Sequence, residues 1–160
     1  MSVKDRFTPE EWSSLLKTPM LVSYAVAGAA PSGEDGFIQE MSAVADAIVE
    51  GGEGAAKDSL LASVVADIVA NATDEQRGQT EKLSVEEVRQ RALDHCRSVA
   101  GLLKTKVSVQ EAGEYKTWVM RVAHKVAKAA KEGGLFGYGG KQISGVEVEI
   151  INEIGEAIAV

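Results

Sequence analysis

Apolar side chains recur every three or four residues along most of the chain, which is the spacing of one buried face of an α-helix. The pattern is most regular over 84–104 and 109–132. The stripes comprise Val85, Val88, Ala92, Cys96, Val99 and Leu103 in the first segment, and Tyr115, Trp118, Val119, Val122, Val126 and Ala129 in the second. The same spacing predicts helices over about 9–17, 19–30, 35–50, 56–72 and 144–158, with exposed connections at 51–54 and 73–82.

Helix starts are marked by four capping boxes, in which an N-cap hydroxyl is followed three residues later by a glutamate. The pairs are Thr8 with Glu11, Ser84 with Glu87, Ser108 with Glu111, and Ser144 with Glu147. Alternation at Val146, Val148 and Ile150 is the best strand candidate, but the cap before it favours a helix. The sequence therefore predicts an all-α, single-domain bundle of about seven helices over residues 1–160.

Two alanine-rich segments have similar sequences at an offset of 100 residues. Val26, Ala27, Ala29, Ala30 and Gly33 match Val126, Ala127, Ala129, Ala130 and Gly133. An apolar helix follows the glycine in both places, with about ten more residues in the second connection. The match predicts two pseudo-symmetric helix-loop-helix units, in which 20–48 superposes on 120–158.

Charge and cysteine content narrow the possible partners. The chain carries 17 basic and 24 acidic side chains, a net charge of −7, which argues against duplex nucleic acid as a partner. The single cysteine, Cys96, excludes an internal disulfide and suits a reducing cytoplasm. The apolar run 20–30 is far shorter than the ~20 residues that a membrane span requires. We therefore expect a cytoplasmic protein that does not span a membrane.

Short motifs in both units resemble the tellurite resistance protein family of TerB type. The second unit has VAKAAKEG at 126–133 and QISGVE at 142–147, and the first has YAVAGAAPSG at 24–33. Glu132 falls at the family's aspartate position and Glu147 at its glutamate position. Ser32 replaces the aspartate in the first unit, and 134–141 is a glycine-rich insertion, so the chain resembles a divergent member. The resemblance implies an all-helical cytosolic protein that is associated with chemical or metal stress. It also implies an acidic surface that binds divalent metal, and no known catalytic reaction.

The loop 133–143 is the main candidate binding feature, because five glycines within 133–140 allow a compact backbone path with accessible carbonyl groups. Glu132, Glu147 and Glu149 lie around it and predict a site for Ca²⁺ or Mg²⁺, although EF-hand spacing is missing. A rival interpretation is an anion site at the helix start near Ser144, beside Lys141, although P-loop spacing is missing too. The third is a structural corner whose aromatic residues pack inward.

Two further features have both a chemical and a structural interpretation. His95 beside Cys96 suggests thiolate chemistry, but the cysteine falls on the apolar stripe, which predicts a buried, inert thiol. Arg121, Lys125 and Lys128 form a basic ridge that fits either a solvated helix face or a membrane, nucleic-acid or acidic protein partner. The sequence thus predicts a noncatalytic stress-associated protein that binds a divalent metal, a protein partner or a second copy. The alternative is an enzyme that binds a small molecule or anion through 133–143.

Overall fold

The computed structural model describes residues 2–29, 33–75, 83–132 and 145–159, with backbone only for 33–38, 73–75 and 130–132. A 3₁₀ helix, η1, and six α-helices account for most of these residues. Their bounds are η1 Val3–Arg6, α1 Pro9–Ala29, α2 Gly33–Gly52, α3 Leu60–Glu75, α4 Val85–Lys106, α5 Val109–Glu132 and α6 Gly145–Ala159. The described ranges contain no strand, so the all-α prediction is confirmed. The described residues form six α-helices where about seven were expected, because the segments 9–17 and 19–30 form one helix, α1.

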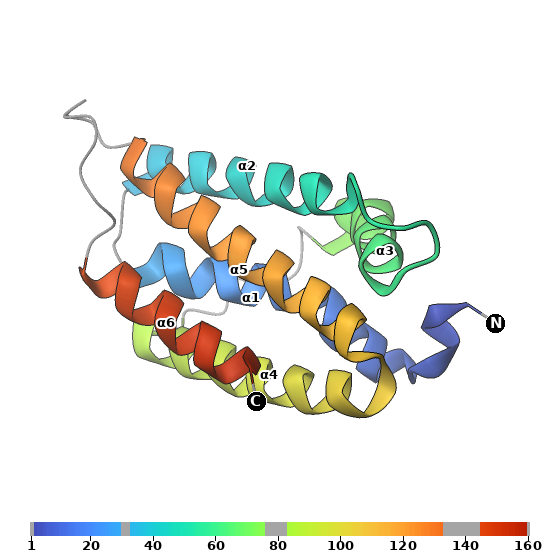
Figure 1. The fold of residues 1–160 in the computed structure, drawn as a ribbon. Helices are drawn as coiled ribbons and strands as arrows, with labels where there is room; N and C mark the ends of the chain where they lie inside the picture. Colours follow the sequence, from blue (N-terminus) through green and yellow to red (C-terminus); the bar gives the residue numbers. More distant parts are fainter. Residues whose placement is uncertain (1, 30–32, 76–82, 133–144, 160) are drawn as a thin grey trace.

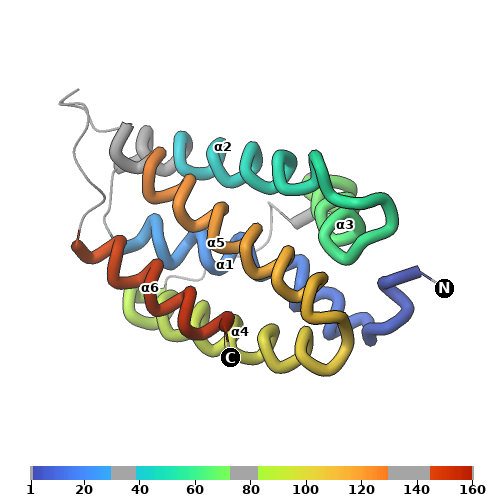
Figure 2. Tube along the Cα trace, in the orientation of Figure 1, coloured from blue at the N-terminus to red at the C-terminus, as the bar shows by residue number. Residues whose placement is uncertain are grey.

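α1 and α5 are the central helices of the bundle, and each contacts all of the other described α-helices. In Figure 1, α1 and α5 run through the middle, with α2 on one side and α4 and α6 on the other. Apolar or small residues are buried on several sides of α1, as expected for a helix surrounded by neighbours. The tube view in Figure 2 shows α4 and α6 lying side by side, and these two helices pack against each other.

The predicted capping boxes form at three helix starts. The backbone N–H of Ser84 donates to Glu87 at 2.7 Å, and the N–H of Glu87 donates to the Ser84 hydroxyl at 3.2 Å. The reciprocal bonds of Thr8 with Glu11 are 2.7 and 3.2 Å long, and those of Ser108 with Glu111 are 3.0 and 3.2 Å. These bonds satisfy N–H groups that the first helical turn leaves without partners. The fourth box begins at Ser144, outside the described residues.

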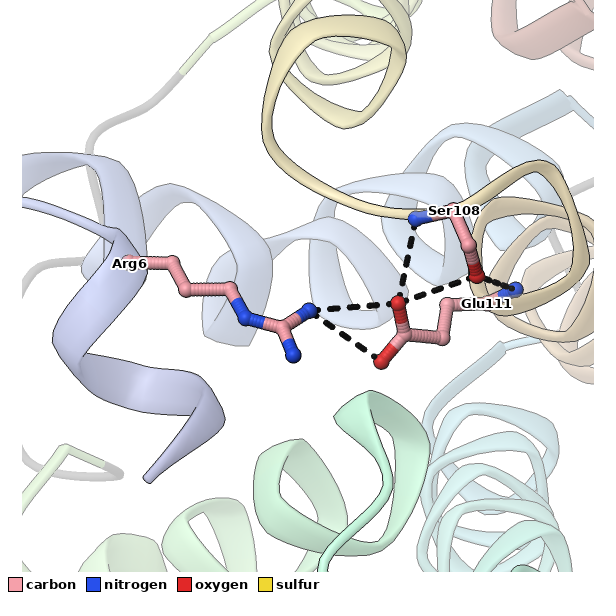
Figure 3. A network of polar contacts seen from close by, with 3 residues as sticks. All are labelled: Arg6, Ser108 and Glu111. Atoms are coloured by element: carbon pink, nitrogen blue, oxygen red, sulfur yellow. Dashed lines mark hydrogen bonds and ion pairs between the residues drawn. The ribbon is translucent and has the colours of Figure 1, made fainter. Parts of the chain in front are cut away.

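The amino-terminal segment is anchored to the bundle by charged side chains. Lys4 pairs with Asp67 of α3 at 2.6 Å, and the indole N–H of Trp12 donates to the same carboxylate at 2.8 Å. Figure 3 shows Arg6 reaching Glu111, at 3.2 Å, while that glutamate also caps α5. The hydrogen bond from Lys4, and then that from Trp12, lowers the pKa of Asp67. One carboxylate therefore joins η1, α1 and α3.

Close packing between α2 and α5 explains why the connection predicted at 51–54 begins two residues later than expected. The segment 51–54 was predicted as an exposed connection, but Gly51 and Gly52 are half-buried residues at the end of α2. A Cβ atom at Gly51 would lie 2.0 Å from Cδ1 of Trp118, so only glycine allows this approach. Trp118 is 2% exposed, as predicted.

Two other local predictions need correction. Val85 was placed on the buried stripe of its helix, yet it is 54% exposed because it occupies the first position of α4, at the rim of the bundle. The connection 73–82 starts later than predicted, since α3 continues to Glu75. Among the described helices, none is long and apolar enough to cross a membrane.

Candidate functional site

The acidic residues of α6 include two of the predicted metal ligands, and their surroundings differ. Glu149 has a 61% exposed side chain and pairs with Arg89 of α4 at 3.2 Å. The same guanidinium makes a two-pronged contact with Glu153, at 2.8 Å through Nε and 2.5 Å through Nη2. These bonds, those to Glu153 first, raise the pKa of Arg89, and the guanidinium lowers the pKa of Glu153. Glu149 therefore belongs to an ion-pair group that joins α4 to α6.

Glu147, the second predicted ligand, is buried in the first turn of α6 and is 2% exposed. Glu40 of α2 is buried in the same way, at 1%, and both carboxylates have interaction partners. The backbone of Glu132 ends α5, and its side chain lies outside the described residues. Within the described part of the chain, no three His, Cys, Asp or Glu side chains converge as a metal site would require. The Ca²⁺ or Mg²⁺ site at Glu132, Glu147 and Glu149 stays a prediction.

The glycine-rich loop 133–143 lies outside the described residues, so its three interpretations stay open. These are the cation site, the anion or small-molecule site of an enzyme, and the structural corner. The described helices on either side, α5 and α6, pack against each other.

Cys96 is buried as the apolar stripe predicted, and His95 also has a structural role. Cys96 is fully buried, and burial raises the pKa of its thiol to about 12, so the thiol stays protonated at neutral pH. The Nε2 atom of His95 lies 2.9 Å from the carbonyl oxygen of Ser14. A carbonyl only accepts, so this nitrogen carries the proton and donates. Burial first, and the charge of Lys17 to a smaller extent, lowers the pKa of His95.

A polar cluster that the sequence pattern does not predict surrounds Pro19, in the middle of α1. Proline has no N–H, so the carbonyl of Leu15, four residues earlier, loses its helical partner. The hydroxyl of Tyr115 on α5 donates to this carbonyl at 2.7 Å. One residue earlier, the Ser14 carbonyl accepts from Thr18 at 2.9 Å as well as from His95. Pro19, at the start of the helix predicted over 19–30, is the local sign of such a cluster. The side chains that donate to the free carbonyl groups come from α4 and α5, which the local sequence does not indicate.

A shallow open groove of about 420 Å³ runs between the start of α1 and the second half of α4. Glu10, Glu11, Ser14 and Leu102 contribute to its walls. Glu11 caps α1 through Thr8, as described above, and also pairs with Lys106 at 3.3 Å. These contacts hold the beginning of α1 against the end of α4, so this carboxylate has a structural role.

The outward side of α5 carries the positive charges of Arg121 and Lys128, with His124 between them in the sequence. Arg121, His124 and Lys128 are exposed, and they have no hydrogen bond or ion pair to any other residue that the structure describes. Their spacing of three and seven residues places them along about 10 Å of one helix side. Lys125, which was predicted to belong to this ridge, is half-buried and pairs with Glu50 of α2.

A complementary acidic row lies on the neighbouring helix. Asp46 and Glu50 are exposed on α2, Glu53 follows its end, and the exposed side chain of Val49 (47%) lies among them. The ion pair between Lys125 and Glu50 joins α5 to the acidic row. We call these residues the α2–α5 face, made of Arg121, His124 and Lys128 from α5 and of Asp46, Val49, Glu50 and Glu53 from the α2 segment.

Comparison with known proteins adds no relative to this picture. No family model matches the chain, and no match was found among curated proteins or solved structures. The TerB-type resemblance therefore stays a prediction from the sequence motifs.

Proposed function

We propose that the chain is a noncatalytic, stress-associated protein of the cytoplasm that works by binding a protein partner through the α2–α5 face. The observation that carries this proposal is the row of Arg121, His124 and Lys128. The charges of Arg121 and Lys128 are exposed and are not neutralised by a described neighbour, although the chain as a whole is acidic. Lys125, by contrast, is neutralised within the chain. Unpaired charges in a row favour a partner that brings the opposite charge.

The buried polar residues support a binding role over a catalytic one. Cys96, a candidate nucleophile, is held as a protonated thiol in the core. His95 and Tyr115, the nearby candidate bases, direct their protons to the Ser14 and Leu15 carbonyls of α1. Each of these groups serves the packing of α1 against α4 or α5. The stress context comes from the TerB-type resemblance, which implies tellurite or related chemical stress.

The proposal is tested by growth of cells that lack the protein, in the presence of tellurite. Wild-type protein is expected to restore growth, whereas Arg121→Glu with Lys128→Glu is expected to fail. Lys17→Glu with Lys104→Glu changes the net charge equally at exposed sites on α1 and α4, and should restore growth. Equal rescue by all three proteins at matched expression would remove the α2–α5 face from the function. No rescue by the wild type would remove the tellurite context.

A further inference from the structure

The α2–α5 face carries both signs of charge on two adjacent helices, and this arrangement is complementary to itself. The basic row belongs to α5 and the acidic row to the α2 segment, and the helices pack side by side. The axes of packed helices lie about 8 to 10 Å apart where they contact each other. The two rows therefore lie side by side where Lys125 pairs with Glu50, although α5 runs at an angle to α2 (Figure 1). A flat acidic partner would satisfy only the basic row. A partner with both signs would satisfy the two rows together.

We propose that the partner at this face is a second copy of the chain, which makes the protein a two-fold symmetric dimer; this inference rests on the proposed function. A two-fold axis that lies in the interface, between α2 and α5 and along the line that bisects their directions, places α2 of each copy over α5 of the other. Arg121 and Lys128 of one copy then face Asp46 and Glu53 of its mate, and the reverse contacts form by symmetry.

The exposed side chain of Val49 lies within the acidic row and would meet the opposing copy in this arrangement. Burying an apolar side chain at a contact rimmed by opposite charges is the usual composition of a protein interface. Charge complementarity also selects the pairing, because a copy turned so that like rows face each other is repelled. The two rows therefore specify both the partner and its orientation.

The dimer is tested with two variants, in which the charges of one row are reversed and those of the other row are kept. The basic-row variant is Arg121→Glu with Lys128→Glu, and the acidic-row variant is Asp46→Lys with Glu53→Lys. Glu50 is left unchanged, since it holds Lys125. Each variant alone has two rows of the same sign, so its self-association should weaken by about 100-fold or more, given several reversed pairs per interface. A 1:1 mixture of the two variants has opposite signs at every contact and should associate again.

Sedimentation equilibrium over micromolar to millimolar concentration measures these affinities, and circular dichroism verifies that each variant is folded. The control Lys17→Glu with Lys104→Glu should associate as the wild type does. A monomeric wild type at millimolar concentration overturns the proposal, as does a mixture of folded variants that stays monomeric.

Co-expression of the two variants in the tellurite assay separates this inference from the proposed function. Restored growth supports the dimer as the working form. If the basic-row variant fails and co-expression also fails while the wild type is monomeric, the face binds a different protein. The proposed function then stands and the dimer is rejected.

Discussion

Replacing Tyr115 with phenylalanine removes a hydrogen-bonded hydroxyl group from the core. The hydroxyl donates to the Leu15 carbonyl at 2.7 Å, and Pro19 cannot supply the N–H that would otherwise reach this oxygen. The aromatic ring is kept, with its edge contact to Trp118 at 5.5 Å between ring centres. Since Tyr115 is fully buried, water does not replace the lost donor at the surface. The substitution thus leaves a buried carbonyl without its partner and also removes the contact of the hydroxyl with Thr18, which keeps its bond to the Ser14 carbonyl.

The free energy of unfolding should fall by roughly 1–3 kcal/mol, which is the usual penalty for a buried acceptor without a hydrogen bond. Against a typical domain stability of about 5–15 kcal/mol, this loss is large enough to measure. Urea unfolding followed by circular dichroism should show a lower midpoint with an unchanged slope. For a slope of about 2 kcal/mol per molar urea, a loss of 2 kcal/mol moves the midpoint by about 1 M.

A second substitution tests the reasoning itself. Pro19→Ala returns an N–H to α1, four residues after Leu15, and so provides the missing helical donor. In that background Tyr115→Phe should cost less, by about 0.5 kcal/mol or more, which a double-mutant cycle detects. An equal loss in both backgrounds would refute the idea that the hydroxyl substitutes for the N–H that proline lacks.

Three more outcomes are expected. Because the pKa of His95 is lowered in the folded protein, the imidazole is protonated in the unfolded chain at a higher pH than in the folded one. The free energy of unfolding should therefore fall as pH drops below about 6.5 and level off below the folded pKa. In a series of urea titrations at different pH values, His95→Gln should remove this pH dependence. Gly51→Ala should destabilise the protein, because its Cβ would meet an indole ring at 2.0 Å, whereas Gly113→Ala, with open space around it, should stabilise the protein by ~0.5–1 kcal/mol; thermal unfolding that ranks them the other way contradicts the packing. Calorimetric titration with Ca²⁺ and Mg²⁺ should release heat that Glu132→Gln with Glu147→Gln abolishes; heat that persists unchanged, or no heat from the wild type at millimolar cation, would reject the metal site.

The helices were predictable because their signals are local. Periodic apolar residues fixed the buried faces, and the Ser84 and Ser108 caps located the starts of α4 and α5 at the next residue. The prediction of a connection at Gly51 and Gly52 was wrong for the same reason. It rested on a local rule, that a glycine pair usually marks a turn. Only Trp118, far along the chain, explains why a glycine is needed within α2. A local pattern does not contain that neighbour.

The candidate site was less predictable, because a charged residue's role depends on which partner the fold brings to it. The sequence predicts Glu149 as a metal ligand and Lys125 as part of an exposed basic ridge. Because α4 packs on α6, Glu149 pairs with Arg89. Because α2 packs on α5, Lys125 pairs with Glu50. The basic ridge was visible from helical spacing, whereas the members that stay unpaired are visible only in the structure.

Pro19 shows how a local rule is overridden by packing. A proline inside a helix removes a hydrogen bond and costs about 3 kcal/mol or more, which predicts separate helices on either side. The chain instead continues as one helix, since Tyr115 supplies the donor for the Leu15 carbonyl and the surrounding helices bury the break. The bonds that hold this position come from residues far away in the sequence, so α1 is continuous only once α4 and α5 have packed. We therefore expect the middle of α1 to lose hydrogen-exchange protection together with those two helices, and not before them.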